Sequence, residues 1–116
     1  MTDKAAAIRQ LLLSAPREAL PMTYQQVATA LTLTPPRTIA QVTRALEQLM
    51  REDAAQQKPF ISALVVSRRG EGMPGVGFFE LAVALGRFPA DTAGHKTAYQ
   101  AEFQRALNER NNDHKS

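Results

Sequence analysis

The stretch from Phe60 to Phe79 constrains the fold more than any other part of this chain. Residues 60–67 form an almost continuous apolar run, and four of the six glycines follow within residues 70–77. An apolar run of this length, bounded by a proline and a glycine-rich segment, predicts a strand that is covered on both faces or central in a small sheet. The glycines predict a tight turn, with Val76 to Phe79 as a short return strand.

Length and composition fit a single folded domain. A chain of 116 residues, 44% of them apolar, has room for one core but not for two. We expect a domain over residues 1–110 and a disordered polar tail over residues 111–116. No apolar run approaches the ~18 residues of a membrane helix. Polar residues also interrupt the N-terminal segment, so we expect a cytoplasmic protein of bacterial type without a membrane partner.

The residue types that are missing exclude several kinds of chemistry. Without cysteine there is no disulfide, no thiolate nucleophile and no thiolate metal site. His95 and His114 are the only histidines, too few for an ordinary zinc site. The chain contains no Ser-x-x-Lys, His-Glu-x-x-His or Gly-x-Ser-x-Gly motif. We therefore expect no metal, no cofactor and no enzymatic activity.

Three helices are predicted before the apolar run. Apolar residues at helical spacing indicate helices over residues 2–14, 23–31 and, from about Pro36, to about residue 54. Thr23, with Gln26 three residues later, has the pattern of a capping box. The short stretch before Thr23 is expected to be extended, because residues that precede a proline avoid the helical region.

Two further helices are predicted after the glycine-rich segment. The first runs from about Phe79 to Leu85, with Gly86 as its C-cap. The second begins at Asp91 or Thr92 and ends near residue 109. Its apolar stripe consists of Tyr99, Phe103, Ala106 and Leu107.

This order of elements is that of a winged helix-turn-helix. The expected fold class is α+β, mostly α, with a small antiparallel sheet and extra C-terminal helices. Leu20 to Met22 and Val76 to Phe79 would flank the apolar strand. In such a fold the third helix enters a DNA groove, and the glycine-rich hairpin, or wing, contacts the backbone.

Arginine and glutamine alternate along one face of the third predicted helix. Both side chains can form two hydrogen bonds with a base edge, arginine with guanine and glutamine with adenine. Arginines in the wing can contact phosphates, and the net charge of +3 is compatible with nucleic acid. The predicted DNA-binding residues are Arg37, Thr38, Gln41, Arg44, Gln48, Arg51, Arg68 and Arg69.

Part of this region resembles a known family. Residues 23–28, Thr-Tyr-Gln-Gln-Val-Ala, followed by Pro36-Arg37 and the helix through Val42 and Ala45, are similar to the DNA-binding half of alkylguanine-DNA alkyltransferases and their alkyltransferase-like relatives. The resemblance covers about a quarter of the chain. It implies a winged helix-turn-helix that binds double-stranded DNA in the minor groove.

The chain departs from that family at its active residues. Residues 59–62, Pro-Phe-Ile-Ser, stand where the family has Pro-Cys-His-Arg, so alkyl transfer is excluded. Ala40 stands where the family has an intercalating arginine. Tyr24 matches the family's tyrosine, and its spacing predicts a core position.

A second resemblance is to small uncharacterised bacterial proteins with the motif Pro-x-Ile-x-Ala-Leu-Val-Val, then Gly-x-Pro-Gly-x-Gly-Phe. Here the motif spans residues 59–78. This likeness implies a shared local structure and no particular activity.

Two alternatives to DNA binding remain. Residues 70–75 satisfy the dinucleotide pattern G-x-G-x-x-G, but Pro74 removes one backbone N–H and no clear strand follows. A type II turn at Pro74-Gly75 explains these residues better. The other alternative is a protein-interaction module, in which the arginine-glutamine face is merely solvated. The C-terminal helix would then dock a partner or form a homodimer through Tyr99, Phe103 and Leu107.

Overall fold

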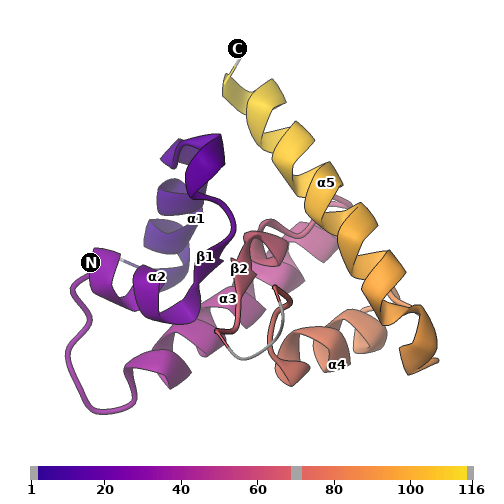
Figure 1. The fold of residues 1–116 in the computed structure, drawn as a ribbon, viewed down its shortest axis with the longest axis horizontal. Helices are drawn as coiled ribbons and strands as arrows, with labels where there is room; N and C mark the ends of the chain where they lie inside the picture. The colour runs from indigo at the N-terminus through magenta and orange to yellow at the C-terminus, as the bar shows by residue number, and fades with distance from the viewer. Residues whose placement is uncertain (1–2, 69–71, 115–116) are drawn as a thin grey trace.

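The fold is mostly helical, with two very short strands (Figure 1). The computed structural model describes residues 3–68 and 72–114. Its elements, with η for a 3-10 helix, are α1 (Lys4–Ser14), η1 (Arg17–Ala19), β1 (Met22–Thr23), α2 (Tyr24–Ala30), α3 (Thr38–Ala55), η2 (Ile61–Leu64), β2 (Val65–Val66), α4 (Val76–Ala84), η3 (Thr92–Gly94) and α5 (His95–His114). Among these helices, none has the length and apolar character needed to cross a membrane.

The first three helices form one half of the core, as their apolar spacing predicts. Asp3 caps α1 by accepting a hydrogen bond from the Ala5 N–H, at 3.1 Å. The predicted capping box of α2 is confirmed, because Thr23 and Gln26 each bond the other's backbone N–H. Both α1 and α2 pack on α3. Their buried side chains include Ile8, Leu12, Val27, Val42 and Leu49.

Three helices end in the same motif, and only one of them uses glycine. The motif needs a left-handed residue just after the helix, with the next N–H bonded back to the last turn. After α4 this residue is Gly86, as predicted, with a φ of 77°. After α2 it is Thr32 and after α3 it is Gln57, with φ angles of 54° and 58°. Glycine alone therefore does not mark where these helices end.

The apolar run is buried as predicted, but it is not one long strand. All residues from Phe60 to Val66 are buried, yet Ile61–Leu64 form η2 and only Val65–Val66 form a strand. The physical reason is that helices, and not strands, surround the run, since η2 packs against α1, α3 and α5. Its backbone groups bond side chains of those helices instead of neighbouring strands.

The predicted antiparallel sheet is wrong. β1 and β2 pair in parallel, with Met22 opposite Val65 and Thr23 opposite Val66. Val76 to Phe79, predicted as a return strand, is the beginning of α4, which therefore starts earlier than expected. The type II turn is also wrong, because Gly75 has a φ of −70° and such a turn needs a positive φ there. The loop is closed instead by a hydrogen bond of 2.9 Å from the Ser67 N–H to the Met73 carbonyl.

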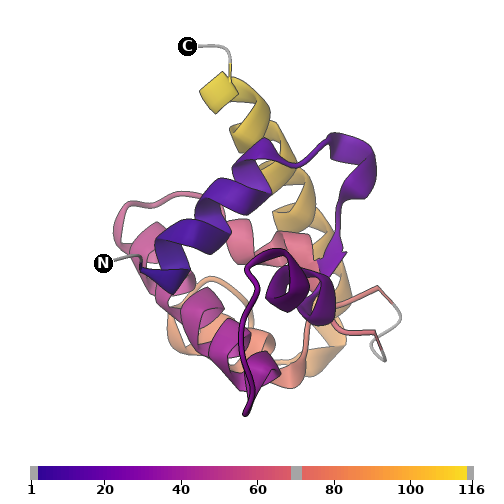
Figure 2. The same ribbon diagram turned by 90° about the vertical axis from the view of Figure 1, so that its left-hand side faces the viewer.

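The second half of the core is aromatic and joins α4 and α5 to η2. Phe78 lies at its centre, with the rings of Phe60, Phe88 and Tyr99 edge-on at 5.7–6.1 Å. Burial raises the pKa of Tyr99, and its neutral hydroxyl donates to the Ala63 carbonyl at 2.8 Å. Figure 2 shows α1 and α2 on the near side of the molecule, with α5 behind them.

The C-terminal helix is longer than predicted, and its apolar stripe packs within the chain. α5 continues to His114, beyond the expected end near residue 109 and into the segment expected to be a disordered tail. Its apolar stripe is also occupied within the chain, because Tyr99 and Leu107 are buried and Phe103 packs against both halves of the core. Tyr99 and Leu107 are therefore covered by the chain itself, and Phe103 is half-buried.

Replacing Glu102 with alanine should lower the free energy of unfolding by about 3–5 kcal/mol, because it would leave buried polar groups without their partner. The fully buried carboxylate accepts hydrogen bonds from the Phe60 N–H at 2.7 Å and from Arg87 at 2.8 Å. Urea denaturation measures the loss. Gln104→Ala, an exposed change in the same helix, should stay within about 0.5 kcal/mol of wild type. A loss below about 1 kcal/mol for Glu102→Ala would contradict this role.

The stability of the protein should also depend on the ionisation of Asp53. Burial raises the pKa of Asp53 above its ordinary value of 3.8, against the opposing effects of the Ile61 N–H and Arg9. Because the folded-state pKa is the higher one, stability from this group is greatest below about pH 4 and is lost as the pH rises through the folded-state pKa. Urea midpoints should therefore fall in wild type relative to Asp53→Asn as the pH rises. If the wild-type urea midpoint instead rises relative to that of Asp53→Asn, attraction by Arg9 outweighs the effect of burial on the pKa of Asp53.

Candidate nucleic-acid interface

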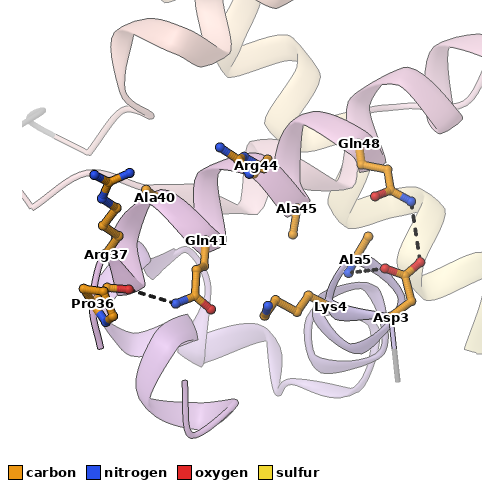
Figure 3. Close-up of a pocket in the computed structure, with 10 residues that line it drawn as sticks. All are labelled: Asp3, Lys4, Ala5, Pro36, Arg37, Ala40, Gln41, Arg44, Ala45 and Gln48. Atoms are coloured by element: carbon orange, nitrogen blue, oxygen red, sulfur yellow. Dashed lines mark hydrogen bonds between the residues drawn. The ribbon is translucent and has the colours of Figure 1, made fainter. Parts of the chain in front are cut away.

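A cavity lies between the first half of α3 and the start of α1 (Figure 3). Its volume is about 340 Å³. Four of the predicted DNA-binding residues line it, together with residues of α1 and of the loop before α3. The lining residues are Asp3, Lys4, Ala5, Pro36, Arg37, Ala40, Gln41, Arg44, Ala45 and Gln48.

The two glutamines of the predicted stripe donate hydrogen bonds to other parts of the same chain. The Gln41 side-chain amide donates to the carbonyls of Thr34 and Pro36, both at 3.1 Å. The Gln48 amide donates to Glu52 at 3.0 Å and to Asp3 at 3.5 Å. Figure 3 shows Gln41 directed at the loop and Gln48 at α1. Because these N–H groups are engaged, they are not free to pair with an adenine edge.

The arginines of the stripe are arranged differently. Arg44 and Arg51 lie seven residues apart on one face of α3, about 10 Å apart along its axis. Arg37 stands seven residues before Arg44, at the N-cap just outside the helix, and these three residues form the arginine line. All three are exposed and make no hydrogen bond or ion pair with the residues that the structure describes. Arg44 lines the cavity, and Arg51 lies two turns beyond it.

Four other arginines show the contrast, because each has a structural role. Arg9 pairs with Glu52 and Asp53, and both Arg87 and Arg105 pair with Glu102. The Arg110 guanidinium bonds three carbonyl groups at the C-terminal end of α1, where a helix dipole favours a positive charge. The line on α3 thus differs from these arginines in having no partner among the described residues.

The remaining predicted residues are more scattered. Thr38 is half-buried at the beginning of α3, and Arg68 is exposed at the start of the glycine-rich loop, outside the cavity. Arg69 lies outside the described residues. Sequence reasoning missed Lys4, which adds a third cation to the cavity, and Asp3, the only carboxylate among the described residues that line it. No periodicity links these α1 residues to α3, so the pattern along α3 contained no signal for them.

The start of α3 is open and its conformation is unusual. Arg37, the residue before the helix, is in the left-handed region with a φ of 61° and a ψ of 43°. Its side chain does not cap α3, and the first turn holds no acidic residue. The Gln41 side chain fixes the preceding loop, so this conformation is held by the surrounding chain. The first N–H groups of α3 are thus left for an external acceptor.

Residues 60–62, which the sequence resemblance sets against the alkyltransferase active site, are buried. Phe60 is fully buried, and the buried Ser62 hydroxyl donates to the Leu46 carbonyl at 2.8 Å. The cavity beside Ser62 and Tyr24 measures only about 10 Å³, too small for a nucleobase. Tyr24 packs against the core, as predicted, and burial raises its pKa. Its hydroxyl accepts a hydrogen bond of 2.8 Å from the Gly75 N–H.

No group of three or more potential metal ligands occurs within residues 3–68 and 72–114. No known protein family, curated protein or solved structure matches the chain.

Arg37→Gly should raise the free energy of unfolding by about 1 kcal/mol over Arg37→Ala, because glycine adopts the left-handed region without strain. Both changes remove the same charge, so alanine is the matched control for the loss of the side chain. Thermal and urea denaturation of the two variants provide the measurement. Equal stability would mean that the loop relaxes and no strain is held at this position.

Proposed function

We propose that the protein binds double-stranded DNA without catalysis, through α3 of a helix-turn-helix formed by α2 and α3. The observation that carries this proposal is the line of exposed arginines, Arg37, Arg44 and Arg51, without partners in the described chain. Four arginines elsewhere in the chain, Arg9, Arg87, Arg105 and Arg110, are bonded within it, whereas these three are not bonded to any described residue. A row of unpaired cations along one helix fits the regular charges of a nucleic-acid backbone.

We expect α3 to contact the phosphate backbone of the DNA and not the edges of the bases. Lys4 and the open start of α3 add to the positive side of the cavity, and phosphate groups bind well at such helix starts. The Gln41 and Gln48 amides, which would read adenine, are engaged within the chain. Arg68 at the start of the glycine-rich loop would supply a further phosphate contact, in the role expected of a wing. The proposed binding is therefore tolerant of sequence.

The alternative, a protein-interaction module that docks through the apolar stripe of α5, is less favoured. Tyr99 and Leu107 of that stripe are buried within the chain itself. A homodimer through this stripe would require α5 to leave its own core.

Arg44→Gln and Arg51→Gln should each weaken binding to duplex DNA and reduce its dependence on salt. For a protein that neutralises phosphates, the logarithm of the binding constant falls with the logarithm of salt by about 0.9 per phosphate. Each variant should lower that slope by about one. Fluorescence anisotropy of a labelled duplex at several salt concentrations gives the slope.

The matched control is Arg17→Gln, since Arg17 is exposed in η1 and does not line the cavity. It should leave the slope near the wild-type value. An identical effect of all three changes would indicate general charge attraction and no defined surface. Absence of binding in wild type at low salt would overturn the proposal.

A further inference from the structure

A second cavity, of about 490 Å³, lies between the outer face of α4 and the segment that leads into α5. It shares no residue with the cavity beside α3, so the inference below does not rest on DNA binding. One wall is formed by Val76, Phe79, Glu80 and Val83 of α4, and the other by Ala90, Thr92 and His95. The volume is in the range of small-molecule sites, and most of the lining is apolar or aromatic.

The sequence of α4 is typical of a helix that is covered on both faces. Phe78 and Ala82 bury one face of the helix in the core. Residues 76, 79, 80 and 83 share the other face, at spacings of three and four, and only Glu80 among them is charged. Val76 is 73% exposed, the most exposed large apolar side chain among the described residues. A helix that is apolar on both faces is ordinarily enclosed, yet this one is open on one side.

The polar groups of the cavity are mainly hydrogen-bond acceptors. The His95 ring stacks on Phe79, with centroids 5.3 Å apart and planes 7° apart. Its Nε2 lies 2.8 Å from the Pro89 carbonyl, which can only accept, so Nε2 carries a proton and Nδ1 accepts whenever the ring is neutral. The Glu80 carboxylate makes no hydrogen bond or ion pair with the described residues.

We infer that this cavity binds a small aromatic amine. The flat ring would lie between the apolar walls beside the Phe79–His95 pair, and the ammonium group would lie near Glu80. Charge complementarity selects this class, because among the described residues Glu80 is the only Asp, Glu, Lys or Arg that lines the cavity. An aromatic carboxylate of the same size would fit the walls but would be repelled by Glu80.

Tryptamine and indole-3-acetate test this inference, since they share one ring and carry opposite charges. The protein contains no tryptophan, so the indole fluorescence of either probe reports binding directly through its anisotropy. We expect saturable binding of tryptamine, about five- to tenfold tighter than that of indole-3-acetate, because attraction by the exposed Glu80 is exchanged for repulsion. In Glu80→Gln the preference for tryptamine, measured as the ratio of the two dissociation constants, should fall below about threefold.

Two further variants locate the site. Val76→Ser should weaken the binding of both probes to the same extent. Because Val76 is exposed, this substitution should not disturb the fold. Glu18→Gln, an exposed acidic residue in η1 outside the cavity, should leave the preference unchanged. The inference is overturned if neither probe binds saturably, if both bind wild type equally, or if the preference for tryptamine persists in Glu80→Gln.

Discussion

Two buried carboxylates hold the centre of this fold. Glu102 of α5 accepts a hydrogen bond from the Phe60 N–H, and Asp53 of α3 accepts one from the next N–H, that of Ile61. A buried segment without strand neighbours must find other partners for its backbone, and these side chains supply them. The segment from Phe60 thereby becomes the piece to which both helices attach, with the α1–α3 half of the core on one side and the aromatic half on the other. The orientation of α3, and so of its exposed arginines, depends on this anchoring.

The sequence predicted the helical part of the fold well and the strands poorly. Helical spacing and the capping box at Thr23 are local signals, and they located α1, α2 and α3 correctly. Burial of the run from Phe60 was also predictable, but apolarity alone does not distinguish a strand from a buried short helix. The bonds that decide the matter come from Asp53 and Glu102, the latter 42 residues away from Phe60. The direction of pairing between β1 and β2 likewise depends on long-range packing, so it had no local signal.

The sequence predicted which residues share one face of α3. It did not predict that the glutamines and the arginines on that face would differ in their bonding. Spacing placed the arginines and glutamines of α3 together, and the cavity does bring four of them to one place. Nothing in the spacing revealed that Gln41 and Gln48 bond the loop and α1 while the arginines face outward. That distinction depends on the neighbours of each side chain. The cavity on α4 was not predictable, because the sequence assigned Val76 and Phe79 to a return strand and Glu80 and Val83 to a helix that begins later, so they were not placed on one helical face.

The separation of glutamines from arginines on α3 has an evolutionary consequence. Gln41 and Gln48 bond the preceding loop and α1, whereas the Arg44 and Arg51 side chains make no hydrogen bond or ion pair with the described residues. Charges in the outer row can therefore be exchanged, added or removed without disturbing the scaffold beneath. Descendants of such a chain would be able to change what they bind through substitutions in this row while keeping the same fold.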